Sequence, residues 1–158
     1  MKKQKGFSLI ELLIVVAIIL IIAAIAIPNL LRSRMAANEA SAVGSVRTIN
    51  TAEVTYASTY PDQGFSQTLA NLTSTASQTS ATSTNAMLID TVLGAGQKSG
   101  YTFTYTPGGV AVNTSYTIQS GPVTMDTTGK RTFFSDSTGV IRYDATGISA
   151  TASSSPLQ

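Results

Sequence analysis

Hydrophobic and polar positions divide the chain into a long apolar run, an amphipathic stretch and a polar remainder with short alternating segments. Residues 7–31 contain 21 apolar residues in 25, and Glu11 is the one charged residue among them. A bilayer core needs about 20 apolar residues in helical form, and residues 7–27 supply that number before Pro28. Apolar side chains would occupy every side of this helix. The pattern therefore favours a membrane helix over a soluble core helix.

A second helical stretch is predicted from about Leu30 to Tyr60, as an amphipathic continuation over residues 32–60. Glu39 and Glu53 fall in register with its apolar face, and such an imperfect stripe is compatible with a subunit contact. Pro28 lacks a backbone donor and marks the expected bend or melted turn in the long spine formed by both stretches. The apolar positions of the second stretch recur at helical steps: Met35, Ala42, Val46, Ile49, Tyr56 and Tyr60.

The polar connection over residues 61–100 contains nine Ser or Thr in the twelve residues 73–84. This composition is typical of a surface loop, which could accept O-linked glycans or could be a plain hydrated loop. Within the connection, residues 85–93 predict a short helix with Thr84 as a possible cap. Four of its side chains could pack on the spine: Met87, Leu88, Val92 and Leu93.

Strand signals begin at residue 101, where aromatic and polar residues alternate over 101–105. Three further segments, 110–119, 131–134 and 140–143, complete an expected antiparallel meander over residues 101–144. One face of this sheet should cover the outer half of the spine, because short strands need a packing partner. Residues 145–158 have few large side chains and predict a flexible tail. The expected fold class is α+β, with a long N-terminal hydrophobic helical spine and a C-terminal antiparallel β-sheet head.

Composition narrows the chemistry of this chain of 158 residues. It has no Cys and no His, so neither a disulfide nor a thiolate metal site is possible, and no nucleophile and base pair is evident. We therefore expect no enzyme activity, catalytic residue or cofactor. Asp126, Asp136 and Asp144 could be imagined as calcium ligands, but turn and cap roles are favoured because no dense carboxylate loop is present. Two triplets, at Asn71 and Asn113, match the N-glycosylation pattern, which is common by chance.

The charge of the chain is concentrated before the apolar run. Its formal net charge is +2, but removal of residues 1–6 with their three lysines leaves seven basic against eight acidic side chains. The excess of basic residues therefore comes from residues 1–6 and gives no support to nucleic-acid binding by the head. Lysines on this flank should instead hold the N-terminus in the cytoplasm. Cleavage at Gly6 would remove this leader and keep the anchor, unlike cleavage of a secretory signal peptide.

Residues 5–16, Lys-Gly-Phe-Ser-Leu-Ile-Glu-Leu-Leu-Ile-Val-Val, together with Pro28, resemble the processing signal of type IV pilins and of the related type II secretion pseudopilins. The resemblance covers about the first third of the chain. It implies that a prepilin peptidase cuts between Gly6 and Phe7 and N-methylates Phe7. It also implies a subunit that is inserted in the inner membrane and then polymerised into an extracellular filament. The major pseudopilin of a type II secretion system, which drives protein export, is the alternative.

Glu11 is the residue on which assembly is expected to depend. A charge at mid-membrane costs roughly 2.5–3.5 kcal/mol on insertion scales and is usually paired or functional. No Lys or Arg lies within the apolar run, so the Phe7 amine is the one cation available at that depth. The resemblance implies that Glu11 of one subunit pairs with the Phe7 amine of its neighbour; the alternative is a merely solvated Glu11. Further implied partners are an inner-membrane assembly platform and its motor ATPase. In the filament, residues just before Pro28, roughly Ala23 to Ile27, should lose regular helix.

Overall fold

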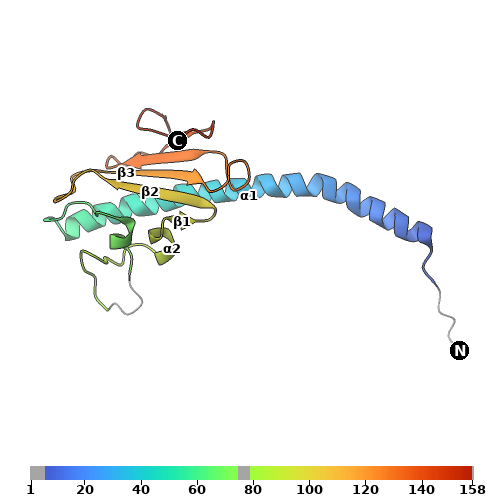
Figure 1. The fold of residues 1–158 in the computed structure, drawn as a ribbon, viewed down its shortest axis with the longest axis horizontal. Helices are drawn as coiled ribbons and strands as arrows, with labels where there is room; N and C mark the ends of the chain where they lie inside the picture. Colours follow the sequence, from blue (N-terminus) through green and yellow to red (C-terminus); the bar gives the residue numbers. More distant parts are fainter. Residues whose placement is uncertain (1–5, 75–78, 158) are drawn as a thin grey trace. The chain divides into compact units, whose positions relative to one another are not determined.

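The computed structural model describes residues 6–74 and 79–157. The chain forms two compact units, Met1–Arg34 and Met35–Gln158, and one helix, α1 (Leu9–Thr59), contributes to both. Six strands follow α1 and form one antiparallel sheet (Figure 1). The predicted α+β class is confirmed, with a long apolar N-terminal helix and a C-terminal antiparallel sheet.

Helix α1 is continuous over 51 residues, and Pro28 lies inside it. The expected melted turn is therefore not formed in the single chain, and a bend that keeps the helical pattern stays a prediction. Pro28 lacks one N–H donor, but the leucine, isoleucine and alanine residues around it favour helix and retain the neighbouring backbone bonds. The loss of helix before Pro28 is expected in a filament and not in the single chain, so it stays a prediction.

The sheet is a meander in which each strand pairs antiparallel with the next. Its longest strands, β2 and β3, pair along their whole length from Tyr101 opposite Pro122 to Pro107 opposite Tyr116. The strand predicted from residue 110 begins later, because residues 108–115 form a loop. The strands are β1 (Gln97–Lys98), β2 (Tyr101–Pro107), β3 (Tyr116–Pro122), β4 (Thr132–Asp136), β5 (Arg142–Asp144) and β6 (Ser155–Pro156).

The helix predicted over 85–93 is wrong in its position and its cap. Residues 86–89 are not helical, and they donate backbone hydrogen bonds to residues 71–73, at the 3-10 helix η1 (Leu69–Leu72). The helix that forms is α2 (Thr91–Gly94), and the Asp90 side chain caps it by accepting the N–H of Leu93. Backbone pairing with the earlier segment outweighs the local helical preference. Leu93 is buried as predicted, whereas Met87 and Val92 are 46% and 56% exposed.

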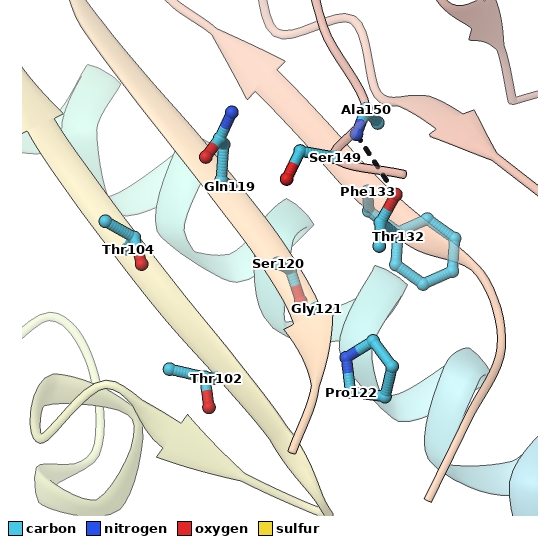
Figure 2. A pocket seen from close by; sticks show the side chains of 10 residues that line it. All are labelled: Thr102, Thr104, Gln119, Ser120, Gly121, Pro122, Thr132, Phe133, Ser149 and Ala150. Carbon is cyan, nitrogen blue, oxygen red and sulfur yellow. Dashed lines mark hydrogen bonds between the residues drawn. The ribbon is translucent and has the colours of Figure 1, made fainter. Parts of the chain in front are cut away.

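The predicted flexible tail instead runs along the sheet and ends in strand β6, which pairs with β5. The N–H of Ala150 donates to Thr132 Oγ1 at 3.0 Å, and Thr132 Oγ1 donates in turn to the carbonyl of Ile148 (Figure 2). The N–H of Leu157 donates to the carbonyl of Ile141 at 2.8 Å. Backbone groups of the segment are thus bonded to the Thr132 hydroxyl and to the backbone near β5, and the size of its side chains does not reveal this.

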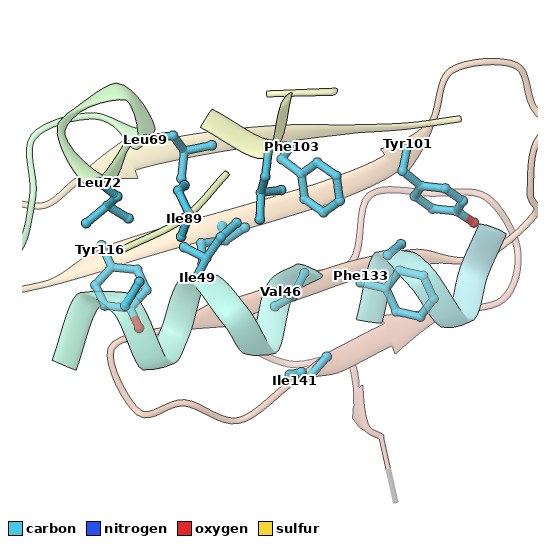
Figure 3. Packing of buried hydrophobic residues seen from close by; sticks show 14 of the residues in the cluster. Val46, Ile49, Leu69, Leu72, Ile89, Tyr101, Phe103, Tyr116, Phe133 and Ile141 are labelled. Atoms are coloured by element: carbon cyan, nitrogen blue, oxygen red, sulfur yellow. The ribbon is translucent and has the colours of Figure 1, made fainter. Parts of the chain in front are cut away.

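The core of the Met35–Gln158 unit lies between the sheet and the second half of α1 (Figure 3). Helix residues Ala42, Val46, Ile49 and Tyr56 are buried there, as their spacing predicted. Sheet residues Tyr101, Phe103, Ile118 and Phe133 supply the opposite side. Close packing of this kind gives the head a core that is independent of the apolar half of α1.

Candidate processing and assembly site

The candidate processing junction, Gly6–Phe7, lies just outside the first turn of α1. Residues 6–8 are not helical, and the helix begins at Leu9. The Phe7 side chain is 78% exposed. No heavy atom from beyond its chain neighbours would lie within 4 Å of a Cβ placed on Gly6. Within the described chain the junction is thus a non-helical, uncovered peptide before the start of a helix.

Glu11 makes a contact that our sequence reasoning missed. Its Oε2 accepts the backbone N–H of Ser8 at 2.9 Å, which supplies a partner for a donor at the helix N-terminus. The order Ser8-Leu9-Ile10-Glu11 is the Ser-x-x-Glu pattern of a capping box, so the signal was present in the sequence. A carboxylate in this turn also lies at the positive end of the helix dipole. Glu11 therefore stabilises the start of α1 before any other subunit is present.

The predicted charge pair of Glu11 with Phe7 is not formed in the uncleaved chain, because the nitrogen of Phe7 is still an amide. Only cleavage after Gly6 would convert that nitrogen into a cationic amine. The pair therefore stays a prediction, as do cleavage at Gly6 and methylation of Phe7. What the structure provides is a carboxylate one helical turn beyond the residue that cleavage would expose.

The apolar half of α1 presents its side chains outward. Every large apolar residue from Phe7 to Leu31 is between 44% and 78% exposed. Among the described residues, α1 is the one helix long and apolar enough to cross a membrane, with a mean hydropathy of 3.3 in its most apolar window. An apolar surface of this extent needs lipid or other apolar helices around it. The helix can therefore be both a membrane anchor and a polymerisation surface.

The two glutamates on the apolar face of α1 contact the head of the same chain. Glu39 accepts the N–H groups of Lys130 and Arg131 and pairs with Arg131 Nε at 2.7 Å. Glu53 is fully buried and binds Ser66. Each of them fixes a loop of the head against α1, which explains why a glutamate lies on the apolar face; the subunit contact beside this stripe stays a prediction. Their partners lie 92 and 13 residues away, which periodicity cannot reveal.

Asn113 is a structural residue and not an accessible glycan acceptor. It is 0% exposed, and its Oδ1 accepts the N–H groups of Gly108 and Gly109 while its Nδ2 donates to the carbonyl of Ser66. Gly64, with φ of +72°, approaches the Asn113 carbonyl so closely that a Cβ there would lie 2.2 Å from the oxygen. The buried side-chain amide of Asn113 therefore joins the loop of residues 108–115 to the segment around Ser66.

The three aspartates considered as calcium ligands lie in separate turns. Asp136 accepts hydrogen bonds from the backbone and hydroxyl of Thr138, and Asp144 does the same for Thr146. These contacts confirm the turn roles that were favoured for Asp136 and Asp144. Asp126 has a positive φ of 57° beside the turn closed by its N–H and the carbonyl of Gly129. Over residues 6–74 and 79–157, no three His, Cys, Asp or Glu gather as a metal site.

Comparison with known proteins bears on the first quarter of the chain. Residues 1–27 match the family model described as the prokaryotic N-terminal methylation motif. Over 39 residues the chain is 64% identical to the type IV wide pilus major component PilA4 of Thermus thermophilus. The N-terminal segment therefore carries this methylation motif. The similarity to the pilus component covers 25% of this chain and 30% of that relative, so the chain spans less than a third of the length of the curated relative it matches. No solved structure matches the chain.

Proposed function

We propose that the chain is the structural subunit of a type IV pilus. The observation that carries this proposal is the methylation motif at the start of α1, whose large apolar side chains up to Leu31 are all exposed. The similarity to a pilus major component over 39 residues supports it. The helix would first be solvated by lipid and later by the helices of other subunits, since both surroundings are apolar.

Processing would prepare the chain for this exchange. The basic leader would hold the N-terminus on the cytoplasmic side of the inner membrane and leave the head outside. A prepilin peptidase would cut between Gly6 and Phe7 and methylate the Phe7 amine. An inner-membrane assembly platform with its motor ATPase would then lift the mature subunit into an extracellular helical filament. The methylation motif supports the processing step, and the apolar N-terminal half of α1 supports a membrane-anchored precursor.

Glu11 would give the assembly its register. In the precursor its carboxylate is engaged by the N–H of Ser8. In the filament the same carboxylate would attract the Phe7 amine of a neighbouring subunit, and the two charges would then lie together in apolar surroundings. Opposite charges attract more strongly there than in water. A misplaced subunit would leave both charges unpaired, which disfavours any other axial position.

A deletion strain distinguishes a pilus subunit from the pseudopilin alternative. We expect the strain to lose surface fibres and to continue exporting proteins, and a plasmid copy of the unaltered gene to restore the fibres. Antibodies against the head should decorate those fibres along their whole length. Loss of protein export with fibres still present would instead favour the pseudopilin.

A further inference from the structure

Glu53 is a buried carboxyl group with few donors around it. Its residue is 0% exposed, on the side of α1 that faces the segment around Ser66. Its Oε2 accepts the N–H of Ser66 at 2.9 Å, and its Oε1 lies 2.5 Å from Ser66 Oγ. The ion pairs formed among the described residues are Lys98 with Asp90 and Arg131 with Glu39, so Glu53 belongs to neither. A buried carboxylate without a cation is costly.

The hydroxyl of Ser66 has one proton and two possible acceptors. Its Oγ lies 2.5 Å from Glu53 Oε1 and 3.1 Å from the carbonyl oxygen of Thr68. If Glu53 were ionised, the hydroxyl would donate to it and the Thr68 carbonyl would lose this donor. If Glu53 is protonated at Oε1, it donates to Ser66 Oγ, whose own proton then goes to Thr68. The protonated form therefore satisfies all three groups and leaves no buried charge.

Other nearby donors are already committed to different acceptors. The Tyr105 hydroxyl donates to the carbonyl of Ser66 at 2.7 Å, and the Nδ2 of Asn113 donates to the same oxygen at 2.6 Å. The Tyr105 hydroxyl also lies close enough to interact with the Glu53 carboxyl, but it has one proton, which it donates to the Ser66 carbonyl. Besides this shared hydroxyl, an ionised Glu53 would keep two donors, both from Ser66, where a buried carboxylate can accept four hydrogen bonds. The small number of hydrogen-bond donors around Glu53 favours its protonated form over the carboxylate.

We propose that Glu53 is a neutral carboxylic acid at neutral pH and that it works as a protonated latch between α1 and the segment from Ser66 to Thr68. The acid donates from Oε1 to Ser66 Oγ and accepts from the Ser66 N–H at Oε2. Ionisation at higher pH would bury an unpaired charge and weaken this attachment. The latch matters because Ser66 also joins β2 and the loop of residues 108–115 through Tyr105 and Asn113.

Among the residues that the structure describes, no cationic side chain interacts with Glu53. Its titratable neighbours are Tyr56 on α1, Tyr105 on β2 and Tyr116 on β3, and the pKa of each of these hydroxyls is raised, chiefly by burial. Residues 64–68 and 108–115, which pack beside it, contain no titratable side chain. Burial likewise raises the pKa of Glu53, against the opposing effect of its hydrogen bonds from Ser66 and from the Tyr105 hydroxyl.

Glu39, on the same helix, provides the opposite case. Its carboxylate accepts three N–H groups, from the backbones of Lys130 and Arg131 and from Arg131 Nε. Burial alone would raise its pKa, but these hydrogen bonds and the Arg131 charge outweigh burial and lower the pKa. Glu39 is therefore ionised at neutral pH. Glu39 and Glu53 together offer a matched test of protonation state, because Gln imitates a protonated carboxylic acid at both positions.

The two sites predict opposite pH dependence of stability. Above the ordinary pKa of about 4.5, an unfolded chain loses the Glu53 proton while the native chain keeps it, so Glu53 makes the free energy of unfolding fall as pH rises. For Glu39 the native chain binds its proton less tightly than the unfolded chain. Its contribution is present above about pH 4.5 and is lost as pH falls.

Thermal unfolding of the full chain in detergent micelles tests the proposal, with Glu53→Gln and Glu39→Gln compared with the unaltered protein. Near pH 5 we expect similar melting temperatures for Glu53→Gln and the unaltered chain. Near pH 8 we expect Glu53→Gln to melt several degrees higher and Glu39→Gln several degrees lower. Melting of Glu53→Gln below the unaltered chain at both pH values, by a margin that grows with pH, would overturn the proposal.

Infrared spectroscopy gives a readout that does not depend on how well the variants fold. With ¹³C-labelled glutamate, the unaltered chain should show the carbonyl band of one protonated carboxylic acid at neutral pH. That band should be absent from Glu53→Gln and present in Glu39→Gln. A spectrum of the unaltered chain with carboxylate bands alone at neutral pH would contradict a neutral Glu53.

Discussion

Glu11 has one partner before processing and is expected to have another afterwards. Gln at this position could still accept the N–H of Ser8, so Glu11→Gln should preserve the start of α1, membrane insertion and cleavage. It would lose the attraction for the Phe7 amine, and an unpaired buried charge costs about 3–5 kcal/mol. We expect normal amounts of processed protein in the membrane and few or no fibres, measured by immunoblot and by yield of sheared fibres.

Co-expression provides the control for this variant. If Glu11→Gln subunits are recruited beside unaltered ones, the fibres should become fewer or shorter. Abundant normal fibres from Glu11→Gln alone would mean that apolar packing suffices for assembly. The charge pair would then have no part in setting the register.

Asn113 supports the end of the head at which residues 108–115 and Ser66 meet. Replacement by Ala would remove the side-chain acceptor of the Gly109 N–H. It would also remove one of the two partners of the Gly108 N–H, which keeps the Ser115 carbonyl, and one of those of the Ser66 carbonyl, which keeps the Tyr105 hydroxyl. An unsatisfied buried group costs about 1–3 kcal/mol, so we expect Asn113→Ala to lower the free energy of unfolding by roughly 1–3 kcal/mol. Chemical denaturation of the full chain in micelles would measure the change.

The neighbouring Thr114 provides a matched control, because it is exposed and belongs to the same Asn-x-Ser triplet stretch. Thr114→Ala should change the free energy of unfolding by no more than about 0.5 kcal/mol. Equal effects of the two substitutions would show that the buried amide is not what holds this loop.

Single residues show where reasoning from sequence reaches its limit. The Ser-x-x-Glu pattern at Ser8 and Glu11 was readable, because both partners lie within one helical turn. Glu39, Glu53 and Asn113 were not, because their partners come from distant parts of the chain. A buried carboxyl group and a surface one look alike in sequence, and only the fold decides which donors face them.

Helix α1 is the element in which the single chain and the proposed filament should differ. In the single chain it is helical through Pro28. In a filament, bundled neighbours can shelter backbone groups that leave the helical pattern. We expect residues 23–27 to lose regular helix there while both flanking halves keep it, and a filament map by electron cryomicroscopy would measure this. An unbroken helix through Pro28 in that map would refute the prediction.

Elements were predictable where one pattern dominated locally. The steps of seven, four and three along α1 identified its buried face, and alternation over residues 101–105 identified β2. Residues 85–93 failed because backbone pairing with residues 71–73 replaced the expected helix. Strand β6 was missed for a similar reason, since its partner β5 and not its composition defines it.

At the scale of the whole molecule, two different kinds of surface share one chain. The apolar half of α1 exposes all of its large side chains, whereas the second half buries its apolar face under the sheet. Such a division suits a subunit whose first part is enclosed by copies of itself and whose second part faces water. The apolar run and the sheet were foreseen from sequence, and the contacts that fasten the sheet to α1 were not.

The intact mass of the subunit in purified surface fibres tests the pilus proposal most directly. We predict that the fibres contain this chain, without residues 1–6 and with one added methyl group on Phe7. Tandem mass spectrometry of the N-terminal peptide would place the methyl group. Fibres that lack the chain, or that contain it with Met1–Gly6 still attached, would contradict the account.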